Sequence, residues 1–215
     1  MSAARDEILD RIRRSLADVP AGERPDDVPV ARAYRRHDHL DHTELVARFA
    51  QTVDEYRATV RRVSIADLPA EVEAECASRA LRTVVVPPGL PAEWRPRDVD
   101  VVEDDNLPAA ELDRIDAALT GCAAAVAQTG TLVLDGRGAS GRRAITLVPD
   151  HHICIVREEQ IVGLVPEAIE RVAGAVREHR APITLVSGPS ATSDIELTRV
   201  EGVHGPRNLI VLIAG

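Results

Sequence analysis

The sequence predicts an α/β fold: a mixed, largely parallel sheet with flanking helices, preceded by a helical arm at the N-terminus. Two observations carry this prediction. Between residues 41 and 121, strand-like and helix-like apolar patterns alternate, which is typical of parallel strands connected by covering helices. The segment NLIVLIAG, residues 208–215, is apolar on both faces. Such a segment is expected to be a strand buried near the centre of the sheet.

The first 35 residues have the composition of an arm and a linker. In residues 2–19, apolar side chains recur at helical spacing and Arg and Asp fill the other face, so we expect an amphipathic helix. Residues 20–33 contain three prolines and many charges, which indicates a linker. We therefore divide the chain into residues 1–35 and an α/β domain of residues 36–215. The helix is free to pack on its own domain or on another subunit.

The next elements follow from capping signals and apolar patterns. Asp41 and Glu44 have the spacing of a capping box, which opens a helix ending near Tyr56. Beyond this helix we expect strands at residues 58–63, 83–87 and 98–104, and helices at residues 66–79 and 107–121.

The middle third is predicted to form consecutive short strands, some of them antiparallel. Its apolar segments are separated by Gly, Pro, Asp and Arg and are too short for helices: 123–130, 131–136, 144–150 and 152–158. A helix at residues 166–179 and a strand at residues 183–188 then lead to the polar segment SGPSATSDIE and to the last strand.

Composition excludes several functional classes. A net charge of -9 and an aromatic content of 2% disfavour nucleic acid as a partner. The chain has no lysine, which excludes Schiff-base chemistry and a lysine-dependent phosphate loop but leaves Arg to bind carboxylate or phosphate. No apolar run is long enough for a membrane span and no signal-peptide core is present. We therefore expect a cytoplasmic protein.

The sequence indicates no cofactor and no metal. Cys76, Cys122 and Cys154 lie 46 and 32 residues apart, without the close pairs of a zinc or iron–sulfur motif, so we expect reduced core thiols. The glycine-rich segment 135–143 lacks the patterns of a nucleotide-binding loop. We interpret it as a solvated hairpin tip, with a basic flap over an anion as the less favoured alternative.

Three histidines near the linker resemble a metal cluster. They are His37, His39 and His42, and Asp41 lies among them. Because Asp41 serves better as a helix cap, and because a metal site needs a closed geometry, we favour a structural role for this segment.

The strongest candidate site combines residues 187–196 (SGPSATSDIE) with residues 202–206 (GVHGP). In open α/β sheets, ligands bind beyond the carboxyl ends of strands, and helix N-termini there attract anions. Ser193 and Glu196 also fit a capping box, which explains the polar composition without any ligand. His204 lies between turn residues and could serve as acid, base or ligand, or only as a loop histidine.

These segments resemble a known family. The run from TGTLVL through LVPDHHICIVREEQIVG to SGPSATSDIELTRVEGVHGP, together with the N-terminal RDEILDRIRRSLAD and AYRR, is similar to the LUD domain family. The resemblance implies a fold related to ribose-5-phosphate isomerase, glucosamine-6-phosphate deaminase and CoA transferases. It also implies a role in the oxidation of L-lactate to pyruvate, with iron–sulfur proteins as partners. Since this chain has no cluster motif, it would be a non-redox subunit.

The family motif marks the residues that we expect at the site. The catalytic candidates are Asp194, Glu196 and His204. The expected ligand, a small anion, would contact Thr129, Gly130, Gly188, Ser190, Thr192 and Gly205. One alternative is a stand-alone enzyme that binds a phosphorylated sugar, a small carboxylate or an acyl-CoA through the same loops. In another, the loops only cap helices and the N-terminal helix mediates oligomerisation.

Overall fold

The computed structural model describes residues 3–20, 22–24, 27, 30–192, 200–202 and 204–215. The chain divides into two compact units, Met1–Arg35 and Arg36–Gly215. The first unit contains helix α1 (Ala3–Ser15), in which Arg11 pairs with Glu7 at 2.7 Å. The apolar side chains of Ile8, Ile12 and Leu16 are exposed along one stripe of this segment, as expected for an amphipathic helix.

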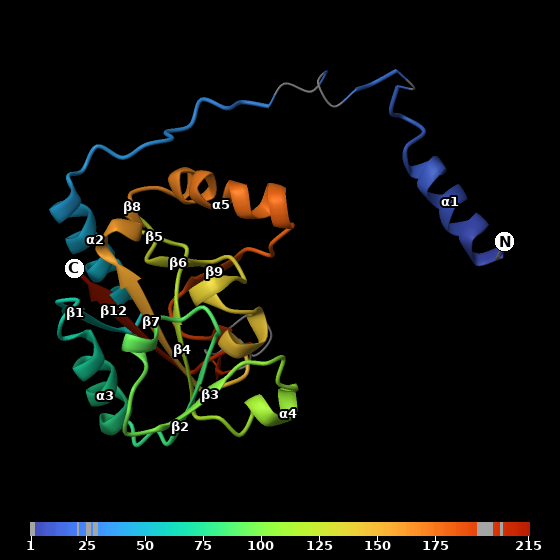
Figure 1. Cartoon of the computed structure of the whole chain (residues 1–215). Helices are drawn as coiled ribbons and strands as arrows, with labels where there is room; N and C mark the ends of the chain where they lie inside the picture. The colour runs from blue at the N-terminus through green and yellow to red at the C-terminus, as the bar shows by residue number, and fades with distance from the viewer. Residues whose placement is uncertain (1–2, 21, 25–26, 28–29, 193–199, 203) are drawn as a thin grey trace. The chain divides into compact units, whose positions relative to one another are not determined.

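A six-stranded sheet forms the centre of the second unit (Figure 1). All of its strand pairs are parallel, and their order is β1-β12-β7-β4-β2-β3. Val211 of β12 lies between Val60 of β1 and Cys154 of β7, so the last predicted strand is buried in the sheet. The strands are β1 (Thr59–Val63), β2 (Thr83–Val86), β3 (Asp100–Glu103), β4 (Ala117–Gly121), β7 (His151–Arg157) and β12 (Asn208–Ala214).

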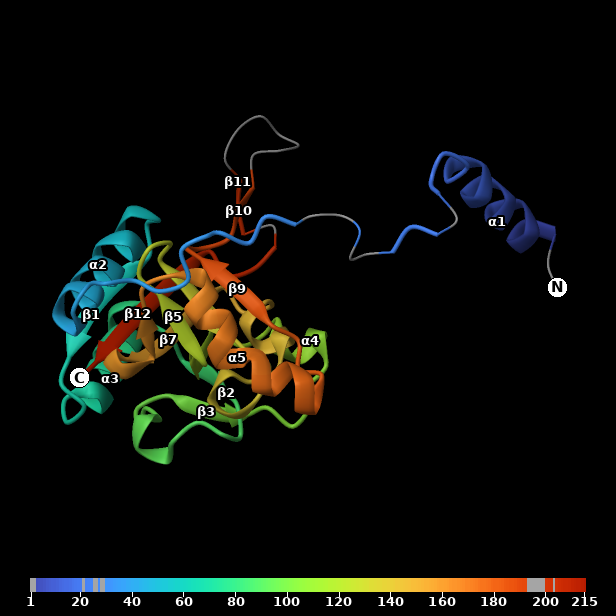
Figure 2. The same cartoon turned by 90° about the horizontal axis from the view of Figure 1, so that it is seen from above.

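Two of the strands predicted in the middle third, β5 and β6, pair antiparallel in a second, four-stranded sheet of order β8-β5-β6-β9, whereas the predicted strand at residues 152–158 is β7 of the large parallel sheet. Only β5 and β8 are parallel in it. A two-stranded hairpin of β10 (Ala191–Thr192) and β11 (Val200–Glu201) stands out from the unit (Figure 2). The four strands of the second sheet are β5 (Ala124–Val126), β6 (Thr131–Leu134), β8 (Ile161–Val162) and β9 (Thr184–Ser187).

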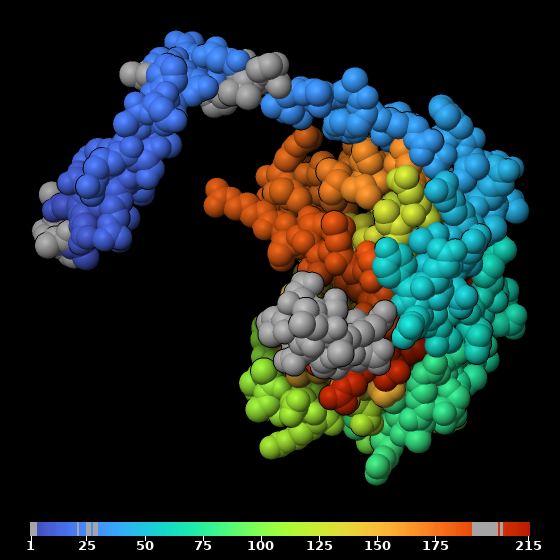
Figure 3. Space-filling model, turned by 180° about the vertical axis from the view of Figure 1, so that it is seen from behind, coloured from blue at the N-terminus to red at the C-terminus, as the bar shows by residue number. Residues whose placement is uncertain are grey.

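The second unit is built in layers, with helices α2 (His42–Glu55), α3 (Leu68–Ser78), α4 (Ala109–Leu112) and α5 (Val165–His179). One face of the large sheet packs on α3 through Val72. The other face packs on α2, through Phe49, and on the small sheet. The outer face of the small sheet is covered by α5, through Val172. Helices α2 and α3 lie along the same edge of the unit (Figures 1 and 3).

Two element predictions are wrong. Residues 107–121 do not form one helix, because α4 ends at Leu112 and Ala117–Gly121 is strand β4, buried along its whole length between β2 and β7. Residues 144–150 do not form a strand. Instead, Arg143–Thr146 is a 3₁₀ turn that buries Ile145 against Leu112. In both segments, tertiary packing overrides local preference.

The glycine-rich segment 135–143 is anchored on the domain, so the interpretation as a solvated hairpin tip is also wrong. The Arg142 guanidinium donates to both carboxylate oxygens of buried Asp104, at 2.6 and 2.7 Å. A Cβ added at Gly89 would lie 2.5 Å from the carbonyl carbon of Gly138. The backbone of this segment therefore rests directly on the loop that follows β2.

Candidate functional site

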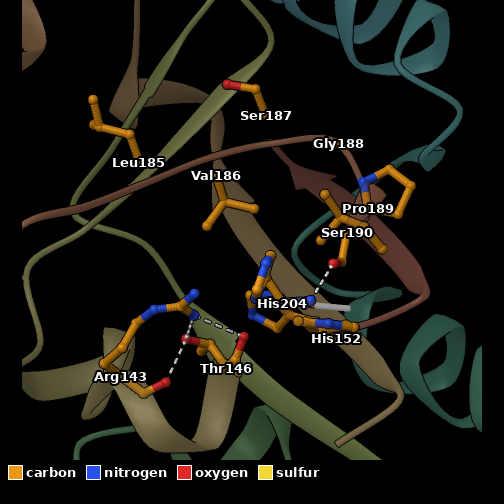
Figure 4. A pocket seen from close by; sticks show the side chains of 13 residues that line it. Arg143, Thr146, His152, Leu185, Val186, Ser187, Gly188, Pro189, Ser190 and His204 are labelled. Atoms are coloured by element: carbon orange, nitrogen blue, oxygen red, sulfur yellow. Dashed lines mark hydrogen bonds between the residues drawn. The ribbon is translucent and has the colours of Figure 1, made fainter. Parts of the chain in front are cut away.

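A cavity of about 230 Å³ lies where the segment after β9 meets the loop before β12 (Figure 4). The amino ends of β7 and β12 and the 3₁₀ turn at residues 143–146 complete its walls. Its lining consists of Arg143, Thr146, His152, Leu185, Val186, Ser187, Gly188, Pro189, Ser190, His204, Gly205, Pro206 and Leu209.

Ser190 joins the two segments that the sequence marks as a site. Its backbone N–H donates to the carbonyl of Pro206 at 2.8 Å, and its carbonyl accepts from the N–H of Gly202 at 3.1 Å. Its Oγ accepts from the backbone N–H of His204 at 3.1 Å, as Figure 4 shows. Because these bonds lock the two loops together, Ser190 and His204 face one cavity.

Gly188 allows the chain to enter this cavity. Its φ is +79°, and an added Cβ would lie 2.9 Å from the carbonyl oxygen of Tyr56. Only glycine meets both constraints without strain. The Gly188 backbone therefore turns from β9 into the site while it packs against the end of α2.

Arg143 supplies the positive charge of the cavity. Its Nη1 donates to the carbonyl of Thr146 at 3.0 Å and lies 3.1 Å from the Thr146 hydroxyl. Burial lowers the pKa of the Arg143 guanidinium, yet an arginine stays charged at neutral pH because its ordinary pKa lies far above neutrality. The 3₁₀ turn thus holds a cation at the wall of the cavity, where a carboxylate or phosphate could pair with it.

His152 is a neutral wall of the cavity. Its side chain is 1% exposed, and its Nε2 lies 2.8 Å from the Oγ1 of Thr120 on β4. Burial, with a smaller contribution from the Arg143 charge, lowers the pKa of His152 to about 4. At neutral pH the imidazole can therefore offer a hydrogen bond to a ligand but adds no charge.

The structure brings together some of the predicted ligand-binding residues. Gly188, Ser190 and Gly205 line the cavity together with the catalytic candidate His204. Thr192 lies in the β10 hairpin. The remaining catalytic candidates, Asp194 and Glu196, and the predicted capping box that begins at Ser193 lie outside the described residues.

Thr129 and Gly130 do not line this cavity. The Thr129 hydroxyl lies 2.7 Å from that of Thr131, which lies 2.8 Å from that of Ser187. Thr129 lines a neighbouring cavity beside α5, and Ser187 lines both cavities. Gly130, with φ +57°, packs on the backbone of Thr52 in α2. The Thr-Gly turn is thus connected to the candidate site only indirectly, by the hydrogen-bonded hydroxyl groups of Thr129, Thr131 and Ser187.

Three polar lining residues were not predicted as site residues: Arg143, Thr146 and His152. Arg143 is the last residue of the glycine-rich segment 135–143, for which the sequence predicts a solvated hairpin tip. In the sequence, His152 is one of two adjacent histidines, and no local pattern shows which of the two faces a cavity. Only the register of β7 beside β12, which pairs His152 with Leu209, brings His152 next to the Ser190 loops.

The cavity lies at the amino edge of the large sheet. The segment SGPSATSDIE follows the carboxyl end of β9, but β9 is an edge strand of the small sheet. In the large sheet, the adjacent strands β7 and β12 begin at His151 and Asn208, next to the cavity. The expectation that these loops extend the carboxyl ends of parallel strands is therefore wrong.

The histidines near the linker lie against different carboxylates. His37 Nδ1 is 3.9 Å from a Glu167 oxygen, whereas His42 Nε2 is 3.4 Å from a Glu158 oxygen. Within the described ranges, no group of three or more His, Cys, Asp or Glu side chains is placed to hold a metal ion. No helix in the described part of the chain has the length and apolar character needed to cross a membrane.

Fold and cavity together define an α/β domain with a small, arginine-lined site beside a parallel sheet. The chain belongs to the LUD domain family, whose model matches residues 92–214. It is 49% identical to "Lactate utilization protein C" of Deinococcus radiodurans over 97% of this chain and 94% of that protein. It is 35% identical to "Lactate utilization protein C" of Shouchella clausii, over 38% of this chain and 36% of that protein.

A solved structure has the same fold. The crystal structure of a DUF162 family protein from Deinococcus radiodurans matches with a TM-score of 0.71 and 46% identity. The match covers 82% of this chain and 99% of that chain.

Proposed function

We propose that this protein acts in lactate utilization, as a non-redox component of a system that oxidises L-lactate to pyruvate. The observation that carries the proposal is the 49% identity, over nearly the whole chain, to a protein named for that process. In this proposal, iron–sulfur proteins are the partners that accept the electrons. This chain contributes binding and orientation.

The chemistry of the candidate site supports a small carboxylate as its ligand. Arg143 offers a cation and the Ser190 hydroxyl offers a hydrogen bond, whereas the Thr146 hydroxyl already donates to the Arg143 carbonyl at 3.2 Å. The volume of about 230 Å³ is below the ~300–1,000 Å³ of pockets for drug-sized ligands. A three-carbon acid such as lactate or pyruvate fits this description: its carboxylate would pair with Arg143 and its second oxygen would face His152 or Ser190.

Co-expression with the two iron–sulfur proteins of the same lactate system tests the proposed assembly. We expect this chain to elute with them in one peak on a sizing column, and the complex to reduce a dye only when L-lactate is present. Elution as separate proteins, or equal dye reduction when this chain is left out, would contradict the proposal.

Arg143→Gln tests the site within that complex. Because the variant removes the charge that would pair with the carboxylate, we expect the KM for lactate to rise at least about tenfold, as for loss of a charged hydrogen bond. The matched control is Arg137→Gln, an exposed arginine of the same glycine-rich segment that does not line the cavity. Equal KM values for the two variants would argue against lactate at this site.

A further inference from the structure

A second cavity, of about 390 Å³, lies at the carboxyl edge of the large sheet. The last residues of β4, β7 and β12 line it: Gly121, Arg157 and Ala214. Ile65 and Gly89, which follow β1 and β2, complete the ring of strand ends. Five parallel strands therefore end around one cavity, in the position where open α/β sheets bind ligands. The candidate site described above lies at the opposite edge.

The walls of this second cavity are largely apolar. Leu68 is fully buried at the start of α3, Trp94 is half-buried, and Ile65 is 60% exposed. At Gly121, an added Cβ would lie 3.1 Å from the Cβ of Ala139 and 3.7 Å from the Trp94 ring. Glycine at the end of β4 thus keeps the space between these two side chains open. A large exposed isoleucine beside an indole favours contact with an apolar group.

Arg157 is the cation available to a ligand in this cavity. Its side chain is 47% exposed, and Glu159, its ion-pair partner at 3.1 Å, is 69% exposed. Such a solvated pair holds its partners only weakly, so a ligand carboxylate can replace Glu159. Glu93 also lines the cavity and is exposed. Its negative charge opposes a bound anion.

The other polar groups of the lining are already engaged. The Gln160 amide donates to the carbonyl of Cys122 at 2.6 Å, and its oxygen accepts from the Arg157 N–H at 2.9 Å. A hydrogen bond with Cys154, together with burial, raises the pKa of the Cys122 thiol well above its ordinary value. Cys122 is therefore a neutral thiol and not a nucleophile. These groups form part of the cavity wall, and Arg157 is the lining residue that can pair with a negatively charged ligand.

We propose that this second cavity binds a small organic acid with an apolar body. The carboxylate pairs with Arg157, and the apolar body rests between Trp94, Leu68 and Ile65. This ligand class is larger and less polar than the three-carbon acid proposed for the Arg143 cavity. The two proposals are independent, because they concern different cavities at opposite edges of the sheet.

Intrinsic fluorescence tests this proposal on the full chain. The chain has a single tryptophan, so the emission of Trp94 reports on this cavity. Phenylacetate is the probe, and phenylacetamide is its uncharged counterpart of similar shape. We expect a saturable change with phenylacetate and binding of the amide at least about tenfold weaker. No saturable change with phenylacetate, or equal affinity for the two compounds, would overturn the proposal.

Charge variants locate the ligand. Arg157→Gln should weaken phenylacetate binding about tenfold, and Glu93→Gln should strengthen it, because the substitution removes a repulsive charge. The matched control is Arg177→Gln, an exposed arginine on α5, and it should leave the affinity unchanged. Since Arg157, Glu93 and Arg177 are all exposed, these variants should fold. Weaker binding by Glu93→Gln, or unchanged binding by Arg157→Gln, would contradict the assignment.

The Arg143→Gln variant separates the two cavities. Its Trp94 response to phenylacetate should equal that of the wild type, because Arg143 does not line the second cavity. A lost response in Arg143→Gln, with Arg157→Gln unaffected, would place the organic acid in the first cavity and overturn the inference. Failure of the lactate complex, in contrast, leaves the fluorescence result unchanged.

Discussion

At the scale of single residues, His152 shows how a titratable group can serve the fold by staying neutral. Its imidazole is buried in the large sheet beside Thr120 and near Arg143. Protonation would add a second cation near Arg143, on a side chain that is almost fully buried. The fold therefore holds the histidine in the form that accepts or donates one hydrogen bond without charge.

The free energy of unfolding should depend on pH through the lowered pKa of His152. Its pKa falls from 6.5 to about 4 on folding, so the unfolded chain binds the proton more readily. The contribution of neutral His152 to the free energy of unfolding is therefore fully present above pH 6.5. About 3 kcal/mol of it is lost as the pH falls toward 4. Urea unfolding of wild type and His152→Gln at pH 7 and pH 4 measures this loss. Because carboxylates titrate in both proteins, the test is whether the wild type loses more free energy of unfolding between pH 7 and pH 4 than His152→Gln does. Equal losses in the two proteins would contradict the prediction.

At the scale of elements, the ion pair of Arg142 and Asp104 fixes the glycine-rich segment. The Asp104 side chain is only 4% exposed and receives two charged hydrogen bonds. These bonds raise the pKa of Arg142. The segment then continues directly into the 3₁₀ turn that holds Arg143. A structural ion pair thus determines where the cation of the candidate site lies.

Arg142→Ala should therefore destabilise the domain strongly. Removal of the guanidinium leaves the Asp104 carboxylate buried without its partner, which costs about 3–5 kcal/mol. Arg137→Ala, in the same segment but exposed, should change the free energy of unfolding by less than about 0.5 kcal/mol. Denaturant unfolding of the two variants checks the difference. A similar small effect of both would show that the ion pair does not anchor the segment.

Elements with local signals were predictable from the sequence, and those that depend on distant partners were not. The capping box of Asp41 and Glu44 forms as expected, with the two bonds at 3.0 and 2.9 Å. In contrast, Ala117–Gly121 combines residues that favour helices with complete burial between two strands. No local pattern reveals the pairing of Ala118 with Val85 and His152, so the helix prediction failed there.

At the scale of the whole molecule, the candidate site was predictable only where it is contiguous in sequence. Ser190 and His204 lie a short distance apart in the chain, and their shared loop pattern marks them as neighbours. Arg143 and His152 reach the same cavity through the packing of a turn and the register of two strands. The residues that line the cavity at the carboxyl edge are spread from Ile65 to Ala214 in the sequence, so no sequence motif predicts this cavity.

The position of β12 between β1 and β7 sets an order of events during synthesis. Thr59 pairs with Ile210, so β1 has no partner in the large sheet until nearly the whole domain has left the ribosome. Until then, the nascent chain presents the edges of β1 and β7, which invite pairing with other chains. We expect a chain that stops at residue 206 to be cleaved rapidly by protease and to bind chaperones, while the chain through residue 215 resists. Equal resistance would show that the remaining strands fold without β12.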